Sequence, residues 1–202
     1  MANCDTHELN LSEAKIHISR CGKGETLLLL HGAGGSANMI TMRDYLTSNY
    51  ADILPDRPGL GRSEQSNMLN SVADLAFHYL DLIEELGLDD IHLVGHSMGG
   101  WIAAEIAIRS TTKAKSLTLI SSAGIHVKGV PKGDLFLWSP EELIQNLYVN
   151  KKIVNEMLSY EPTGDELEIM VKNRVAAARY AWQPRLYNPD LSKWLHRIDV
   201  PT

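Results

Sequence analysis

Residues 95–99 read Gly-His-Ser-Met-Gly, a Gly-x-Ser-x-Gly pattern between the apolar run 91–94 and the apolar segment 101–109. A serine on such a sharp strand-to-helix turn has a strained backbone that only small neighbours permit, and its Oγ is presented above the sheet. A helix that starts at Met98 points free N–H groups toward the same spot. Ser97 is therefore suited to nucleophilic chemistry such as acyl transfer; the alternative is an ordinary glycine-rich turn with a solvated serine.

A second glycine-rich loop lies at residues 31–35, which read His-Gly-Ala-Gly-Gly and follow the apolar run 26–30. Acyl transfer needs a nucleophile, a base that takes its proton, and fixed donors where oxyanion charge develops. One such donor is typically worth a factor of about 100 to 1,000 in turnover. Because loops 31–35 and 95–100 end strands that can be neighbours, their N–H groups can converge on one site. We interpret His31 and His96 as residues that orient these loops.

Strand and helix patterns alternate along the first part of the chain. Short apolar runs favour buried parallel strands, and apolar residues at helical spacing favour helices between them. A half-exposed, peripheral antiparallel strand is expected within residues 9–21. The other expected strands are 26–30, 51–54, 91–94 and 115–120, and the expected helices are 38–46, 72–86 and 101–109. This order predicts an α/β fold with a doubly wound, mostly parallel sheet whose loops meet at the carboxyl edge of the strands.

From about residue 129 the strand signal stops and helix start signals replace it. Residues 139–142 read Ser-Pro-Glu-Glu, with Ser at the N-cap, Pro at N1 and Glu at N3, and residues 163–166 repeat this logic. We therefore expect a core in residues 1–127, an inserted helical cap in residues 128–188, and a return to the core in residues 189–202.

Three motifs together resemble the α/β-hydrolase fold superfamily, in its broad group of single-domain enzymes with a helical cap. They are the loop 31–35, the loop 95–100 with its Gly-x-Ser-x-Gly, and residues 56–63, which read Asp-Arg-Pro-Gly-Leu-Gly-Arg-Ser. Each follows an expected strand, and the resemblance covers essentially the whole chain. It implies the α/β-hydrolase fold with a helical cap insertion.

The resemblance also implies a function and its residues. Ser97 would be the nucleophile, and the backbone N–H groups of Met98 and Ala33 would form the oxyanion hole, with Gly34 as the open alternative to Ala33. The implied activity is that of a serine hydrolase on a small-molecule substrate: an ester, a lactone or a related acyl compound. Cleavage of a carbon–carbon bond next to a ketone is also open. No cofactor and no metal ion is implied.

The acid and the base of such a site are hard to find in this chain. In this fold both follow the nucleophile, each after a later strand. Only two histidines follow Ser97, namely His126 and His196. The sole carboxylate between Ser97 and His126 is Glu105, in an expected buried helix, and His196 follows Asp190 at the exit of the cap. We therefore expect the fold to be C-terminally incomplete here, with the acid and the histidine beyond Thr202, and these 202 residues alone to be weakly active at best. 

An incomplete sheet has a further consequence. The strand 115–120 would then be an uncovered edge with apolar surface around it, which invites self-association.

Two other functions are alternatives to the hydrolase. Residues 32–37 match the Gly-x-Gly-x-x-Ala pattern of NAD(P)-dependent oxidoreductases, with Asp56 about 20 residues further on. Tyr148 and Lys152 supply a Tyr-x-x-x-Lys pair, but this pair lies in the helical insertion and the interpretation leaves Ser97 unexplained. The second alternative is a non-catalytic ligand-binding or receptor-like member of the same fold.

Composition and charge exclude several classes. The net charge of −6 disfavours a nucleic-acid-binding or anionic-membrane-binding surface. The longest apolar run, residues 27–30, is far too short to span a bilayer. The start of the chain lacks the basic and apolar regions of a signal peptide, so we expect a cytoplasmic location. Cys4 and Cys21 have no Cys-x-x-Cys spacing, and we expect both to be reduced.

Overall fold

The computed structural model describes residues 4–202, and its centre is a six-stranded sheet. The strand order is β1-β2-β4-β3-β5-β6. The strands β4, β3, β5 and β6 are parallel, whereas β1 and β2 form an antiparallel hairpin that joins the sheet at β4. The strands are β1 (Asp5–Asn10), β2 (Lys15–Gly22), β3 (Glu25–Leu30), β4 (Tyr50–Pro55), β5 (Ile91–His96) and β6 (Ala114–Ile120). The expected α/β fold with a mostly parallel sheet is confirmed.

The antiparallel part of the sheet differs from the expectation. The region 9–21 contributes to two strands, β1 and β2, and only β1 is peripheral, because β2 lies between β1 and β4. Ile16 and Ile18 of β2 are fully buried. The alternation around His17 therefore marks a strand whose one face belongs to the main core.

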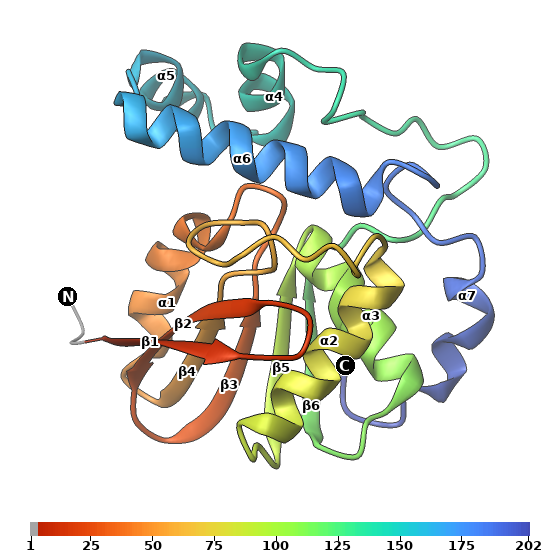
Figure 1. Cartoon of the computed structure of the whole chain (residues 1–202). Coiled ribbons are helices and arrows are strands. Elements are labelled where there is room, and N and C mark those ends of the chain that lie inside the picture. Colours follow the sequence, from red (N-terminus) through yellow and green to blue (C-terminus); the bar gives the residue numbers. More distant parts are fainter. Residues whose placement is uncertain (1–3) are drawn as a thin grey trace.

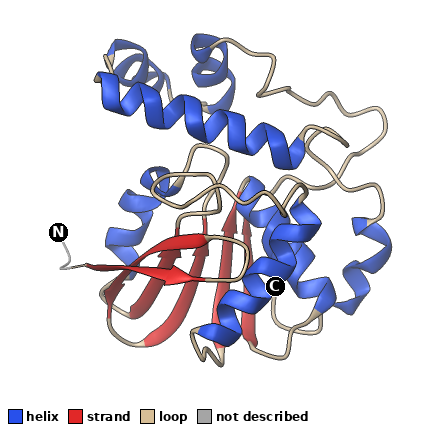
Figure 2. Ribbon diagram, in the orientation of Figure 1, coloured by secondary structure: helices blue, strands red, loops and turns tan. Residues whose placement is uncertain are grey.

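Helices cover both faces of the sheet (Figures 1 and 2). On one face, α2 (Val72–Glu85) and α3 (Met98–Arg109) pack over the larger core, which includes Leu28 and Leu30 of β3. On the other face, Leu27 and Leu29 pack in a smaller cluster with residues of the 3₁₀ turn Ser36–Met39 and of α1 (Ile40–Leu46). Because successive strand residues point to opposite faces, a segment buried on both faces is apolar throughout, as residues 27–30 of β3 are.

The predicted helix starts are confirmed by side-chain caps. Ser71 and Asp74 form a capping box at α2, Ser139 and Glu142 do so at α4 (Pro140–Leu147), and Thr163 and Glu166 do so at α6 (Gly164–Ala181). Each box satisfies N–H groups that would otherwise lack a partner at the helix start.

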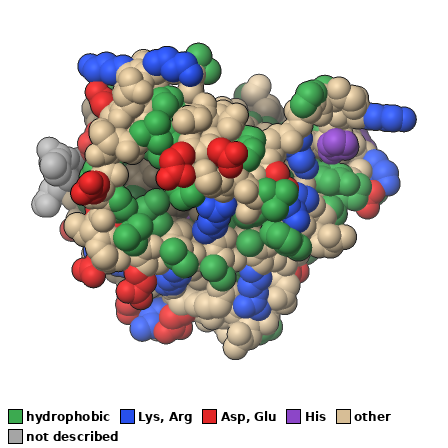
Figure 3. All heavy atoms as spheres, turned by 90° about the horizontal axis from the view of Figure 1, so that it is seen from above, with side chains coloured by type: hydrophobic (Ala, Val, Ile, Leu, Met, Phe, Trp, Pro, Cys, Tyr) green, Lys and Arg blue, Asp and Glu red, His purple; other side chains and the backbone are tan. Residues whose placement is uncertain are grey.

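The helices α4, α5 (Lys151–Ser159) and α6 form a layer above the carboxyl edge of the sheet (Figure 1). Figure 3 looks down on the molecule from this side and shows apolar and acidic side chains exposed together. A groove of about 510 Å³ lies among the three helices and is lined mainly by apolar side chains, including Ile144, Met157, Leu167 and Met170. These helices follow β6 as expected, while the domain boundaries 1–127, 128–188 and 189–202 stay predictions.

The end of the chain returns to the sheet. After α7 (Leu191–Trp194) and the 3₁₀ turn Leu195–Arg197, the carbonyl of Pro201 accepts a hydrogen bond from the N–H of Leu117 in β6, at 2.9 Å. Within residues 4–202, β6 is an edge strand of the sheet. Self-association through this edge stays a prediction. Among the same residues, no helix combines the length and the apolar character that crossing a membrane requires.

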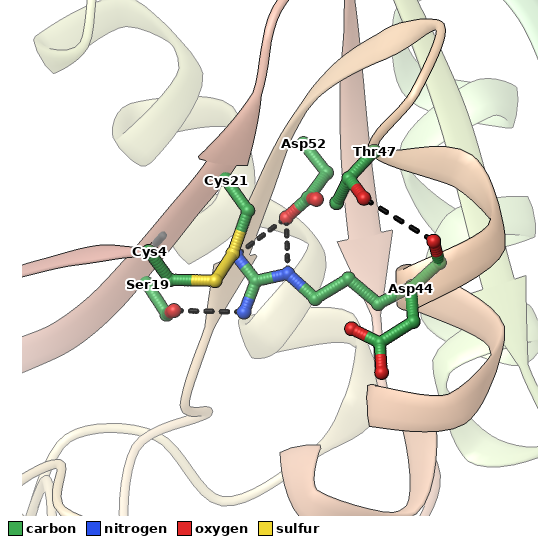
Figure 4. Close-up of a disulfide and its surroundings, with 7 residues drawn as sticks. Cys4, Ser19, Cys21, Asp44, Thr47 and Asp52 are labelled. Atoms are coloured by element: carbon green, nitrogen blue, oxygen red, sulfur yellow. Dashed lines mark hydrogen bonds and ion pairs between the residues drawn. A yellow bond between two sulfur atoms is a disulfide. The ribbon is translucent and has the colours of Figure 1, made fainter. Parts of the chain in front are cut away.

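The prediction of reduced cysteines is wrong, because Cys4 and Cys21 form a disulfide (Figure 4). The antiparallel register pairs Asp5 with Arg20, so Cys4 and Cys21 follow as the next opposite residues, with Cα atoms 4.4 Å apart. Sequence spacing alone does not reveal such a cross-strand pair. Disulfides are rare in the reducing cytosol, so this pairing counts against the cytoplasmic location, which stays a prediction.

A buried ion pair lies beside the disulfide (Figure 4). Nε of Arg43 donates to Asp52 at 2.5 Å, and Nη1 of Arg43 donates to Ser19 Oγ at 2.7 Å. Burial raises the pKa of Asp52 against the opposing effect of the arginine. The contacts join α1 to β4 and β2 on the face that α1 covers.

The disulfide is expected to stabilise the fold measurably. Cys4 and Cys21 are 17 residues apart, and a closed loop of this size is worth about 3 kcal/mol. The double variant Cys4→Ser, Cys21→Ser should lower the free energy of unfolding in urea by about this amount, and dithiothreitol should destabilise the wild type but not the variant. Two titratable thiols in the native, unreduced protein would contradict the pairing.

Candidate active site

Ser97 has the backbone strain that the sequence pattern predicts. It lies between β5 and α3 with φ 54° and ψ −118°, a conformation that non-glycine residues rarely adopt and that costs about 1 to 3 kcal/mol. Two backbone hydrogen bonds hold Ser97 against the end of β6 and the loop that follows it. The N–H of Ser97 donates to the carbonyl of Ile120 at 2.9 Å, and the carbonyl of Ser97 accepts from the N–H of Ala123 at 3.1 Å. The residue is half-buried.

The glycines on either side of Ser97 leave no room for side chains. A Cβ on Gly95 would overlap the carbonyl oxygen of Gly99, and a Cβ on Gly99 would overlap the carbonyl oxygen of Leu30 in β3. The helix α3 therefore starts in direct contact with the end of the neighbouring strand. This is the physical reason for small residues at positions 95 and 99, as expected from the sequence.

The loop after β3 meets the turn at Ser97. A Cβ placed on Gly32 would lie 3.3 Å from Cβ of Ser97 and 3.3 Å from Nδ1 of His96. Ala33 follows and is half-buried, whereas Gly34 is exposed. The N–H of Met98 is the first in α3 and has no acceptor within the helix. The predicted residues Ser97, Met98 and Ala33 thus lie in two adjoining loops, and the choice between Ala33 and Gly34 stays open.

His31 is a buried, neutral ring that ties the first loop to the loop after β4. Its Nδ1 donates to the carbonyl of Gly32 at 2.8 Å, and its Nε2 accepts from the N–H of Arg57 at 3.0 Å. Burial, followed by the charge of Arg57, lowers the pKa of His31 to about 3. A ring with both nitrogens occupied and such a low pKa orients the loop and is not the base, in line with the interpretation from the sequence.

Arg57 is the residue that the sequence did not single out. It is fully buried, with Nη1 3.3 Å from Sδ of Met98 and Nη2 donating to the carbonyl of His31. Burial lowers the pKa of Arg57. Arginine is rarely buried, so a pattern of turn residues gives no sign that this side chain reaches beneath both loops. One guanidinium therefore contacts the residues that begin each loop of the site.

The two histidines that follow Ser97 lie elsewhere. His126 is exposed, with its ring centroid 5.3 Å from that of Tyr187, and His196 is exposed with its centroid 6.3 Å from that of Trp194. Asp190 is ion-paired with Lys193. Among residues 4–202, no histidine hydrogen-bonds to Oγ of Ser97. That neither serves as the base stays a prediction.

Two other acidic residues have structural partners. Glu105 is buried in α3, where it accepts from Nε1 of Trp101 at 3.1 Å and pairs with Arg109 at 2.5 Å. Asp56, which a dinucleotide site would need for a ribose, accepts from Ser36 and from the N–H of Arg62. Its carboxylate is thus engaged within the protein, which weakens the oxidoreductase alternative. The described part of the chain holds no cluster of three or more potential metal ligands of the His, Cys, Asp or Glu type.

Comparison with known families decides the classification. The family model described as alpha/beta hydrolase fold matches residues 25–159. The chain belongs to this family. The match includes all three sequence motifs and both loops at Ser97.

Individual relatives agree with this classification. The chain is 31% identical over 202 aligned residues to a 2-hydroxy-6-oxononadienedioate/2-hydroxy-6-oxononatrienedioate hydrolase of Klebsiella pneumoniae, with 95% of this chain and 65% of the relative covered. It is 29% identical over 160 residues to the dihydrolipoyllysine-residue acetyltransferase component of the acetoin cleaving system of Cupriavidus necator, with 73% and 43% covered. A putative lipase from Acinetobacter baumannii superposes with a TM-score of 0.69 at 29% identity, with 98% and 72% covered. The chain spans about half the length of the curated relatives it matches.

The contact between Gly99 and Leu30 predicts a large cost for any side chain at position 99. Gly99→Ala should lower the free energy of unfolding by at least about 3 kcal/mol, because the overlap is with backbone and cannot relax by a rotamer change. Gly164→Ala is the matched control: nothing lies within 4 Å of its Cβ, and alanine favours the helix, so urea unfolding should change by less than about 1 kcal/mol. Equal effects of the two substitutions would contradict the packing described.

The lowered pKa of His31 predicts a loss of stability in acid. The folded state resists protonation down to about pH 3, whereas the unfolded chain binds a proton below about pH 6.5, so stability falls as the pH decreases between these values. His31 alone contributes a slope of up to about 1.4 kcal/mol per pH unit in this window. Urea unfolding from pH 7 to pH 4 should show a slope smaller by about this amount in His31→Gln. An unchanged slope would show that His31 titrates normally.

Proposed function

We propose that the protein hydrolyses a small ester, lactone or related acyl substrate through an acyl-enzyme formed at Ser97. The observation that carries the proposal is the strained, half-buried Ser97 beside the glycine loop after β3, where a Cβ built on Gly32 would lie 3.3 Å from Cβ of Ser97. A nucleophile and two sets of backbone donors thus share one edge of the sheet. The family membership and the hydrolase names of several relatives support the same activity.

In the proposed reaction, Oγ of Ser97 attacks the carbonyl carbon of the substrate and gives up its proton to a base. The carbonyl oxygen, on which negative charge develops, accepts hydrogen bonds from the N–H of Met98 and from that of Ala33 or Gly34. The leaving group departs with a proton, and water then attacks the acyl carbon and restores the serine. Residues 4–202 hold the serine and its proposed donors.

The relatives suggest a second substrate class for the same serine. The names of the hydrolases from Klebsiella pneumoniae and Burkholderia cepacia describe 6-oxo compounds, which carry a ketone. Cleavage of the carbon–carbon bond next to that ketone also transfers an acyl group to water. The acetyltransferase component of Cupriavidus necator is likewise named for the movement of an acyl group.

Labelling and turnover test the proposal on the whole gene product. Fluorophosphonate should attach to Ser97, and Ser97→Ala should lose at least about 1,000-fold in p-nitrophenyl ester turnover, because removal of the nucleophile leaves only binding and backbone donors. Ser122→Ala, which removes an exposed serine of the loop after β6, is the control and should keep wild-type turnover. Turnover that survives Ser97→Ala would sink the proposal. A protein that binds acyl compounds without turning them over would support the non-catalytic alternative.

A further inference from the structure

Asn173 of α6 is a buried polar residue that contacts two loops far from it in the sequence. It is 4% exposed, although the preceding turns of α6 are exposed on all sides. Its Nδ2 donates to the carbonyl of Gly34 at 3.0 Å, and its Oδ1 accepts from the N–H of Gly61 at 2.9 Å. These partners precede it by 139 and 112 residues. One amide thus joins the helical layer to the loops that follow β3 and β4.

The loop after β3 is shaped to receive this side chain. Gly35 has φ 95°, and a Cβ there would lie 2.5 Å from Nδ2 of Asn173. Three of the four residues 32–35 are glycine, whose backbone is conformationally free, so outside contacts must fix the loop. His31 and Arg57 anchor its start from within the core. Asn173 holds its other end from above.

We infer that Asn173 is a positioning residue for the oxyanion hole: its hydrogen bond to the carbonyl of Gly34 restrains the backbone of the loop that supplies the proposed donor N–H, that of Ala33 or Gly34. This inference rests on the proposed function, because it assigns Asn173 a role in the same reaction. The donor that stabilises the oxyanion is then in place only when α6 is docked on the loops. The amide acts through backbone geometry and does not touch the reacting atoms.

The neighbouring Lys172 provides a matched control. Its Nζ donates to the carbonyls of Gly61 at 2.8 Å and Ser63 at 3.2 Å, so it also docks α6 on the loop after β4. Neither of these hydrogen bonds involves Gly34. Lys172→Ala therefore removes contacts of α6 to the loop after β4 and leaves the hydrogen bond to Gly34 in place. Asn173→Asp keeps the acceptor for Gly61 and replaces the donor to Gly34 by a carboxylate oxygen that repels its carbonyl.

Steady-state kinetics of the whole gene product test the inference. Asn173→Asp should lower kcat for a p-nitrophenyl ester by about 10- to 100-fold, because a displaced oxyanion donor costs less than a removed one, which is worth about 100- to 1,000-fold. KM should stay within about threefold of wild type. Lys172→Ala should change kcat by less than about threefold. The thermal unfolding temperatures of the two variants should be alike. Protonation of the new carboxyl restores a donor, so the deficit in kcat relative to wild type should narrow toward acid pH.

The outcomes separate the inference from the function on which it rests. A wild type without Ser97-dependent turnover overturns both. Ser97-dependent turnover with equal kcat in Asn173→Asp and Lys172→Ala leaves the proposed function standing and overturns the inference. A loss of kcat that tracks a loss of thermal stability also overturns it, because Asn173 would then only hold the fold.

Discussion

The strained backbone of Ser97 is the constraint on which the rest of the site depends. A residue at φ 54° keeps this conformation only if its surroundings enforce it, and here the enforcement comes from three directions. The N–H of Ser97 bonds to Ile120 of the next strand, its carbonyl is held by Ala123, and α3 presses Gly99 against the end of β3. These contacts therefore hold Ser97 in a strained backbone conformation at the carboxyl edge of the sheet.

The buried chain of contacts beneath Ser97 explains how two loops keep one geometry. Arg57 contacts Met98 and the carbonyl of His31, and the ring of His31 in turn fixes Gly32. A buried charge is costly unless it is hydrogen-bonded, and Arg57 meets part of this need with the carbonyl at the start of the first loop. The loops are thus coupled to each other through the core and, by Asn173, to the helical layer above.

Local patterns in the sequence predict most of the fold and the centre of the site. The glycine spacing around Ser97, the apolar runs of β3 to β6 and the Ser or Thr caps of α2, α4 and α6 each depend on residues close in the chain. The parts that the sequence could not reveal depend on distant contacts. Cys4 meets Cys21 only through the strand register, Arg57 is buried against the usual tendency of arginine, and Asn173 finds partners more than 100 residues away. No local pattern encodes these three.

A structure of the fluorophosphonate adduct would test the convergence of the two loops at Ser97 most directly. The account predicts phosphorus bonded to Oγ of Ser97, with the phosphoryl oxygen about 2.7 to 3.1 Å from the N–H nitrogen of Met98 and from that of Ala33 or Gly34. This measurement would also decide between Ala33 and Gly34. A phosphoryl oxygen turned to solvent, or a label on another residue, would contradict the account.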